Sequence, residues 1–489
     1  WQQEEQYEAK VNGTWPQRPL LMTKSLRFND GSSDYLFFTP LTTTNRRTFT
    51  ISFWFKQTNS GAQSYMFSTG NYASGDGLLQ IKISGSGRIT VDDFDQSGSS
   101  YNLRWTTPSA GPLIRDPGAW YHFVLAVDST QGTQSNRAKF YQNGVDISSS
   151  FTQTTNPAQN DDFHINTSGQ IQQVGRSQAN SDYYDGYLTE FIVVDGQQLA
   201  PTSFGVANSD GVWTPITYTG TFGTNGFNLQ FENAAALGED SSPNGNTFTV
   251  NNLTSIDQTT DYPVVNFATA NSLNVNAGAV GTFTDGNLTI KVANSSGSVF
   301  GSSSTIGASS GKWYCEVKII TIDSTMIGVS PSPSEDARNN TSPSGANSSG
   351  AVGCLTETGT KYVSDSGTTY GAATSANGIM MIALDLDNLK VYFGSGGQWA
   401  NGSGAWNQSG LTSGAAISIT AVASTAEGAY FFSFGDGGGS AKGKVSWNFG
   451  NPPFAISSSN ADGNGYGNFE YAVPSGYYAL NTANLAEFG

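Results

Sequence analysis

Charged residues, cysteine and histidine are all scarce in this sequence. Lysine, arginine, aspartate and glutamate together make up only 12% of its 489 residues, whereas aromatic residues alone make up another 12%. Disordered chains show the opposite balance, with many charges and few aromatics, so we expect a folded protein. A chain of this length is too long for one hydrophobic core, and two or three domains are therefore predicted.

Cysteine and histidine occur twice each, which limits the available chemistry. Cys315 and Cys354 exclude a disulfide scaffold, and leave open either two buried free thiols or one bridge in the second half. Together with His122 and His164 they give no convincing zinc site and no cysteine–histidine nucleophile pair. His122 lies within a predicted strand, where a structural role is expected.

The few charges that are present are mostly negative, and the formal net charge is −16. An acidic surface repels nucleic-acid phosphates, so no binding to nucleic acid is expected. No apolar run reaches the roughly 18 residues that a membrane-spanning helix needs, and no membrane insertion is expected either. No signal peptide is visible, and because the sequence opens with Trp1 we expect processing or residues upstream.

Glycine is abundant, at 58 residues, and with Ser, Thr and Asn it separates short aromatic and β-branched runs. This pattern predicts many strands joined by tight turns. From Phe49 to Phe55 every second residue is apolar, which predicts a strand over residues 48–56 with one buried face. Residues 120–127 form a second strong strand. The Asn143-Gly144 pair predicts a tight hairpin.

The second half has strand patterns of its own. Residues 313–319 alternate in the same way, beginning with Trp313 and Cys315 on one face. Residues 379–386 are apolar apart from Asp385, which predicts a central strand buried on both sides. The two halves do not align as a repeat, and very little helix is predicted.

The order of these landmarks resembles two known families. Over about residues 21–215, the landmarks of laminin-G-like sandwiches are matched in order by residues 25–29, 120–122, 140–144 and 185–190. Over about residues 280–455, a SPRY domain is resembled by residues 311–316, 327–329, 384–387 and 448–450 with Phe454. Residues 261–273, which begin Asp261-Tyr262-Pro263, are similar to a joint between two such domains in virion proteins of tailed phages, especially marine ones.

We therefore predict an all-β chain of two tandem concanavalin-like or jelly-roll sandwiches with a short N-terminal arm. Residues 1–20 form the docking arm. Residues 21–260 form a laminin-G/concanavalin A-like sandwich with closing strands. Residues 261–489 form a SPRY-like sandwich with a C-terminal extension.

Three acidic segments resemble the first half of a calcium-binding loop, at residues 93–98, 240–245 and 460–465. Oxygen ligands at alternate positions followed by Gly suit Ca²⁺. All three lack the Glu at position twelve, and the same residue types also make plain turns. The best candidates for a Ca²⁺ site are Asp92, Asp93 and Asp95, because laminin-G-like domains sometimes bind Ca²⁺ at loop rims.

Aromatic residues between glycines are candidates for sugar binding. Trp399, Trp406 and Asn407 lie in one Gly-rich segment; indole faces pack against sugar C–H groups and amides bond hydroxyls. The alternative is that Trp399 closes the end of its sandwich.

Catalytic carboxylates are not evident. No Glu is followed two positions later by Asp, so the one-strand carboxylate triplet of sandwich glycosidases is missing. Asp385 and Asp387 share a face by spacing, but Asp387 lies in a predicted turn. We therefore expect no enzymatic activity.

The resemblance implies a viral structural protein, a tail fibre or similar appendage on the virion surface, that attaches to a host-surface glycan or protein. It also implies other virion proteins as partners, and a homotrimer or another homo-oligomer. Alternatives are a non-adhesive part such as a head decoration protein or tail adaptor, a bacterial cell-surface lectin, or a polysaccharide hydrolase. Fold alone does not decide between them.

Overall fold

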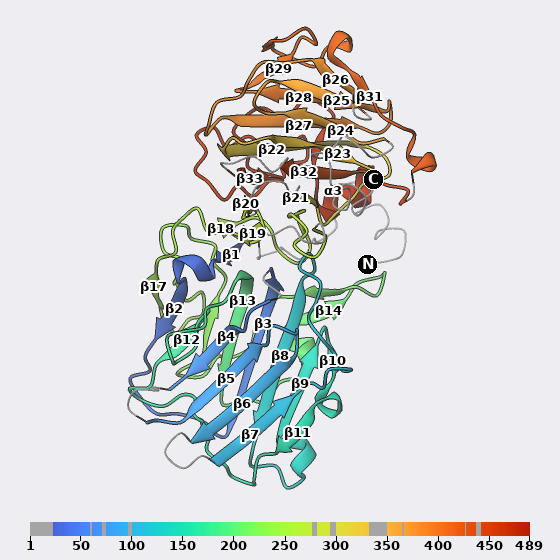
Figure 1. Cartoon of the computed structure of the whole chain (residues 1–489). Helices are drawn as coiled ribbons and strands as arrows, with labels where there is room; N and C mark the ends of the chain where they lie inside the picture. Colours follow the sequence, from blue (N-terminus) through green and yellow to red (C-terminus); the bar gives the residue numbers. More distant parts are fainter. Residues whose placement is uncertain are drawn as a thin grey trace, which may run out of the picture.

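Two β-sandwiches follow one another in the computed structural model, the first in blue and green and the second in yellow to red (Figure 1). The structure describes residues 23–58, 61–70, 75–95, 100–275, 281–293, 300–331, 350–363, 366–425, 427–436 and 442–489. Within these ranges the one α-helix is α3 (Thr482–Phe488), beside short 3-10 turns. The prediction of an all-β chain with very little helix is confirmed. The predicted arm over residues 1–20 lies outside the described residues.

The first sandwich consists of two eight-stranded sheets. One runs β10-β9-β8-β3-β13-β1-β18, with β16 paired to β13. Its strands are β1 (Ser25–Phe28), β3 (Thr48–Gln57), β8 (Tyr121–Asp128), β9 (Ala138–Gln142), β10 (Val145–Asp146), β13 (Gly186–Asp195), β16 (Phe227–Leu229) and β18 (Gln258–Thr259). The other runs β11-β7-β6-β5-β4-β12-β2-β17. Its strands are β2 (Tyr35–Phe38), β4 (Ser64–Thr69), β5 (Leu78–Ile83), β6 (Ile89–Asp95), β7 (Ser100–Thr106), β11 (Thr152–Thr155), β12 (Gln172–Val174) and β17 (Thr249–Asn251). A separate ribbon pairs β14 (Gly205–Ala207) with β15 (Trp213–Pro215).

The second sandwich has a ten-stranded and a six-stranded sheet. The larger runs β19-β20-β33-β22-β27-β28-β29-β30, with β31 beside β28 and β34 beside β22. Its strands are β19 (Gly281–Thr284), β20 (Thr289–Val292), β22 (Lys312–Thr321), β27 (Ile379–Asp385), β28 (Lys390–Ser395), β29 (Gln398–Ala400), β30 (Trp406–Gln408), β31 (Ile417–Ser418), β33 (Lys444–Asn448) and β34 (Tyr478–Ala479). The smaller contains β21 (Phe300–Ser303), β32 (Phe431–Asp436), β23 (Thr325–Ser330), β24 (Val352–Leu355), β25 (Thr360–Val363) and β26 (Ser366–Thr369), in that order across the sheet.

Strand β3 forms where its alternation predicts it, and Phe49, Phe53 and Phe55 enter the core between the two sheets. The prediction that only one face of this strand is buried is wrong, because nearly every residue of β3 is buried. A second apolar layer, which includes Phe204 and Phe222 from the segment after β13, covers the outer face of this sheet. Local alternation does not reveal a cover that comes from so far along the chain.

His122 belongs to this covered outer face. It stacks on Trp54 at 4.6 Å between ring centroids, and its Nδ1 accepts a hydrogen bond from Trp213 Nε1 at 3.0 Å. Its Nε2 lies 2.8 Å from Ser52 Oγ, with both residues sealed from solvent. Burial lowers the pKa of His122 to about 3, so the ring stays neutral. The structural role expected for this histidine is confirmed.

The core of the second sandwich forms around β22 and β27, which pair along their length. Strand β27 is buried on both faces, as predicted. Cys315 and Cys354 are buried free thiols, and burial raises the pKa of Cys354 to about 12, which keeps this thiol protonated.

The second sandwich is closed by chain segments from opposite ends of its sequence. Strand β34 pairs in parallel with β22, and Leu480 enters the core. The carbonyl of Leu480 accepts from the amide of Ala268 at 3.0 Å, and the Thr482 amide donates to the carbonyl of Asn266 at 3.0 Å. Residues near the joint are therefore held by the segment that ends in α3.

Candidate functional site

The joint between the sandwiches is anchored by a buried ion pair. Lys56 Nζ contacts Asp261 Oδ2, and side-chain exposure is 0% for the lysine and 1% for the aspartate. Trp120 Nε1 donates to Asp261 Oδ1 at 2.9 Å, and Lys56 also donates to Asn266 Oδ1 at 2.9 Å. Burial lowers the pKa of Lys56 and raises that of Asp261, while the charge of each partner opposes the shift of the other.

Further polar contacts cross the same boundary. Asn29 Nδ2 donates to Asp285 Oδ1 at 2.8 Å, and Tyr187 Oη donates to the carbonyl of Gly286 at 3.0 Å. Asn287 Nδ2 donates to the carbonyl of Thr58 at 3.1 Å. These bonds hold the two sandwiches against each other on one side of the joint.

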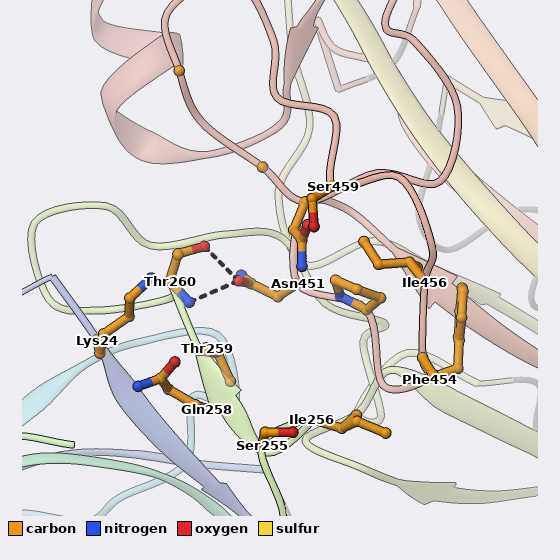
Figure 2. A pocket seen from close by; sticks show the side chains of 15 residues that line it. Lys24, Ser255, Ile256, Gln258, Thr259, Thr260, Asn451, Phe454, Ile456 and Ser459 are labelled. Atoms are coloured by element: carbon orange, nitrogen blue, oxygen red, sulfur yellow. Dashed lines mark hydrogen bonds between the residues drawn. The ribbon is translucent and has the colours of Figure 1, made fainter. Parts of the chain in front are cut away.

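A cleft of about 600 Å³ opens between the two sandwiches, beside β18. Figure 2 shows Lys24, Gln258 and Thr259 on the side of the first sandwich, facing residues of the loop that follows β33. The lining consists of Lys24, Ser255, Ile256, Gln258, Thr259, Thr260, Asn451, Pro452, Phe454, Ala455, Ile456, Ser459, Gly465, Gly467 and Asn468. The lining therefore combines hydroxyl and amide groups with apolar side chains, and both sides contribute polar residues, among them Gln258 on one and Asn468 on the other.

Asn451 connects the two walls of the cleft. Its Oδ1 accepts from the backbone amide of Thr260 at 3.0 Å and from the Thr260 hydroxyl at 2.7 Å (Figure 2). Because both donors bond to Oδ1, they fix the orientation of the Asn451 side-chain amide, and its Nδ2 remains to be paired. Asn451 is 5% exposed, and its Nδ2 has no hydrogen-bond partner among the described residues. A buried donor without a partner is costly, and a bound water or ligand oxygen is one way to satisfy such a group.

Lys24 carries the one charge among the described residues that line the cleft. Its ammonium has no ion pair or hydrogen bond within the described part of the chain. The carboxylates on this side have other partners: Asp257 lies 3.8 Å from Arg27 Nη2, and Glu232 accepts from the amide and hydroxyl of Thr23. Lys24 is thus the charged side chain that the cleft lining presents, on a molecule with a formal net charge of −16.

The apolar part of the lining is provided mainly by Phe454, Ile256 and Pro452. The Phe454 ring has Lys318 Nζ at 5.1 Å from its centroid, and Ile256 is 39% exposed. Below this wall, Arg27 Nη2 donates to the carbonyl of Ile256 at 2.9 Å. The arginine, which is 2% exposed, therefore supports the cleft from behind.

The structure places two of the predicted calcium ligands, Asp92 and Asp93, on opposite faces of β6. Asp92 lies 3.5 Å from Lys82 on the outer face of β6, whereas Asp93 lies opposite the core residues Leu79 and Leu103. Successive residues of a strand point to opposite faces, so these two carboxylates diverge. Asp95 ends β6, and residues 96–99 lie outside the described residues.

Asp93 has a structural set of partners. Its Oδ1 lies 3.0 Å from His164 Nδ1 and accepts from Asn102 Nδ2 at 2.8 Å, while Oδ2 accepts from the His164 amide at 2.9 Å. No group of three or more potential metal ligands occurs in the described part of the chain. Calcium binding stays a prediction.

The other two calcium-like segments are turns closed by their own aspartates. Asp240 accepts from the amides of Asn228, Ser242 and Asn246. Asp462 accepts from the amides of Asn464, Tyr466 and Ala479. In both segments the carboxylate organises the backbone around it.

The aromatic residues predicted to bind sugar have different environments. Trp399 is 5% exposed and packs with Tyr314, so protein covers its ring faces, as the alternative of a closing residue requires. Trp406 is half-buried, and its Nε1 donates to the carbonyl of Ala372 at 2.8 Å. Asn407 is exposed. For Trp406 and Asn407 sugar binding stays a prediction.

The carboxylates considered for catalysis are engaged in structural bonds. Asp385 accepts from Lys312 at 2.9 Å and from the amide of Asn388; burial opposes its ionisation, but these bonds hold its pKa below the ordinary value. Asp387 accepts from the amide of Gly311 at 2.9 Å. Glu316 is fully buried and accepts from Tyr314, Asn448 and two backbone amides.

The cleft residues Lys24, Asn451 and Thr260 were not predicted as site residues. One signal pointed toward them, because the joint at residues 261–273 was singled out and Thr260 directly precedes it. Asn451 could not be paired with Thr260 from the sequence, since nearly two hundred positions separate them.

Residues 30–200 match a family model described as the concanavalin A-like lectin/glucanases superfamily, Laminin_G_3. This match lies within the range over which we predicted a laminin-G-like sandwich. Among curated proteins none matches the chain. Within the described residues, every helix is too short or too polar to cross a membrane.

Several solved structures are similar to parts of the chain, at low overall scores. The SPRY domain of human HERC1 is 15% identical, with 33% of this chain and 87% of that chain covered and a TM-score of 0.24. A heptameric SAP-like pentraxin from Limulus polyphemus is 17% identical, with coverages of 36% and 77% and a TM-score of 0.26. A Bacteroides ovatus protein named for carbohydrate binding is 15% identical, with coverages of 48% and 59% and a TM-score of 0.32.

Proposed function

We propose that this chain is a binding protein without enzymatic activity, which attaches to a glycan or protein on a host surface. The observation that carries the proposal is the cleft at the joint, where hydroxyl and amide groups stand beside apolar side chains and Asn451 Nδ2 lacks a partner among the described residues. Ligand sites combine apolar surface with a few placed polar groups in this way. The lectin-like family match over residues 30–200 supports a binding role.

The resemblance of the two-domain order to phage virion proteins supports the setting that we propose. The chain is then part of a multi-copy appendage on the virion surface, with other virion proteins and further copies of itself as partners. Single sites for sugars are weak, so attachment relies on several copies acting together.

Binding is tested with the purified protein on a glycan array and on host cells. We expect saturable binding that is lost in the Asn451→Asp variant, because this change retains oxygen acceptors for Thr260 and removes the unpaired donor. Retained binding in that variant would place the ligand elsewhere. Absence of binding to glycans, host proteins and cells would leave a non-adhesive virion part as the better explanation.

Location and catalysis need separate tests. Antibody labelling of intact particles is expected to mark a projecting appendage, whereas a chain inaccessible between shell or shaft subunits would support the structural alternative. Incubation with the bound glycan is expected to release no reducing ends. Sustained release, abolished by Asp385→Asn, would overturn the assignment as a non-enzyme.

A further inference from the structure

The one charged residue in the lining of the cleft limits the class of ligand that the cleft can bind. Lys24 is the one charged residue among the described lining residues, and its ammonium has no partner there. The chain as a whole carries a formal net charge of −16. An isolated cation in a neutral lining favours an anionic group on the ligand.

The neutral residues of the lining indicate which class of anionic ligand fits the cleft. Ser255 and Asn468 offer neutral donors and acceptors, and Asn451 Nδ2 has no acceptor among the described residues, whereas Gln258 Nε2 already donates to the carbonyl of Phe231 at 2.6 Å. Phosphate-rich ligands and nucleic acids are held by several cations, because each phosphate contact needs its own positive group or amide cradle. One lysine among hydroxyls and amides instead matches a single carboxylate on a molecule rich in hydroxyl groups.

The apolar part of the lining fits the apolar side of a sugar ring. Phe454 presents an aromatic ring that Lys318 approaches at 5.1 Å from the centroid, and Ile256 and Pro452 extend this surface. Sugar C–H groups pack against such surfaces while the sugar hydroxyls remain free to bond the polar lining residues. The volume of about 600 Å³ lies within the range of small-molecule sites, which is roughly 300–1,000 Å³.

We propose that this cleft binds an acidic saccharide, with Lys24 holding the carboxylate of a sugar acid and Asn451 Nδ2 donating to one of its oxygens. The inference rests on the proposed glycan-binding function and adds the chemical class of the ligand. It places the site between the two sandwiches and not at the Trp406 loop.

The test uses the full chain and titration calorimetry with trigalacturonic acid and 3′-sialyllactose. Each acid is compared with its carboxyl-reduced, neutral form. We expect at least one acid to bind at least ten-fold more tightly than its reduced form. Lys24→Gln should remove this preference, whereas Lys291→Gln, which changes an exposed lysine of β20 outside the cleft, should leave it intact.

Two further variants probe the wall and the volume of the cleft. Asn451→Asp should weaken binding of the acid at least ten-fold, because the amide donor is replaced by a carboxylate that repels the carboxylate of the ligand. Ala455→Trp places a bulky ring at an exposed lining position, breaks no side-chain bond, and should abolish binding with an unchanged melting temperature. It therefore keeps the test decisive if Asn451→Asp fails to fold.

The outcomes separate the two proposals. Equal binding of acidic and neutral forms, unaffected by Lys24→Gln but lost in Ala455→Trp, would overturn the acidic class and leave glycan binding standing. Tight binding of tetraglutamate in place of the sugars would assign the cleft to an acidic peptide. Failure of these probes, together with no signal from any glycan on an array, would overturn both.

Discussion

Lys56 and Asp261 are the pair of residues on which the joint depends. Their charges are fully removed from water, with Lys56 Nζ also 4.7 Å from the ring centroid of Tyr187. We predict that Lys56→Met or Asp261→Asn lowers the free energy of unfolding by about 3–5 kcal/mol, because each leaves a buried partner unpaired. Urea denaturation of the single variants measures this loss.

The double variant Lys56→Met/Asp261→Leu is the matched control. With neither charge present there is no unpaired ion to bury, so most of the lost stability should return. A double variant as unstable as the sum of the singles would mean that the two residues act independently and that the ion pair is not the cause.

Glu190 is a second buried charge, and it makes stability depend on pH. It is 3% exposed and accepts from Gln230 Nε2 at 2.7 Å. Burial raises its pKa from 4.5 to about 7, so the folded protein holds this proton more tightly than the unfolded chain. Its contribution is fully present below about pH 4.5 and is lost as the pH rises through 7.

Between pH 4.5 and 8, ionisation of Glu190 should lower the free energy of unfolding by roughly 3 kcal/mol. We predict that this decrease is absent in the Glu190→Gln variant. The substituted amide keeps an oxygen for Gln230. Burial raises the pKa of Asp34 to about 6, so Asp34 also lowers the stability as the pH rises. The contribution of Glu190 is therefore the difference between the pH profiles of the wild type and the variant. Identical pH profiles in urea denaturation would contradict the assignment.

At the scale of elements, the hairpin between β9 and β10 shows how a turn is fixed. Asn143 and Gly144 have φ values of +49° and +82°, as the predicted tight turn requires. A Cβ on Gly144 would lie 2.7 Å from the ring of Trp213. Gly169 has nearly the same backbone, at φ +79°, but open space around it.

These two glycines form a matched pair for mutation. Gly169→Ala should cost about 1 kcal/mol, because the left-handed conformation alone is strained. Gly144→Ala should cost about 1–3 kcal/mol more, since Trp213 must also move. Thermal unfolding of both variants checks the difference; equal losses would show that the ring contact is unimportant.

The predicted calcium ligands Asp92, Asp93 and Asp95 lie on strand β6. We expect millimolar Ca²⁺ to give a small calorimetric heat and to raise the melting temperature, with Asp95→Asn removing both effects. Asp92→Asn serves as the comparison, because that carboxylate faces Lys82 across the outer face. No heat and an unchanged melting temperature would leave this segment as an ordinary strand and turn.

The sequence predicts the strands and turns better than it predicts the residues of the candidate site. The strands β3 and β27 and the β9–β10 hairpin follow from neighbours in sequence, because alternation and turn residues act locally. Burial of the outer face of β3 does not, since Phe204 and Phe222 come from a remote segment. The cleft is harder still, because Thr260 and Asn451 become neighbours only when the sandwiches meet.

At the scale of the whole molecule, we predict that attachment depends on copy number. If each chain offers one weak site, linked copies gain affinity through their effective concentration. Under the proposed role in virion attachment, a multimer should therefore block adsorption of virions to host cells at least a hundred-fold better than the same concentration of monomer, by the ~10²–10⁴ gain typical of linked sites. Ala455→Trp in the multimer is the control, and equal inhibition by monomer and multimer would contradict the prediction.

The pairing of β34 with β22 has a consequence for biosynthesis. The described strands of the first sandwich are all present once β18 has been made, so we expect it to fold as a unit while translation continues. The second must wait for Tyr478–Ala479, which emerge after all its other described strands. During that interval, on the order of tens of seconds, β22 lacks one neighbour and the segment after the joint lacks the backbone of Leu480. A chain terminated early would carry a finished first sandwich and an open second one, exposed to chaperones and proteases.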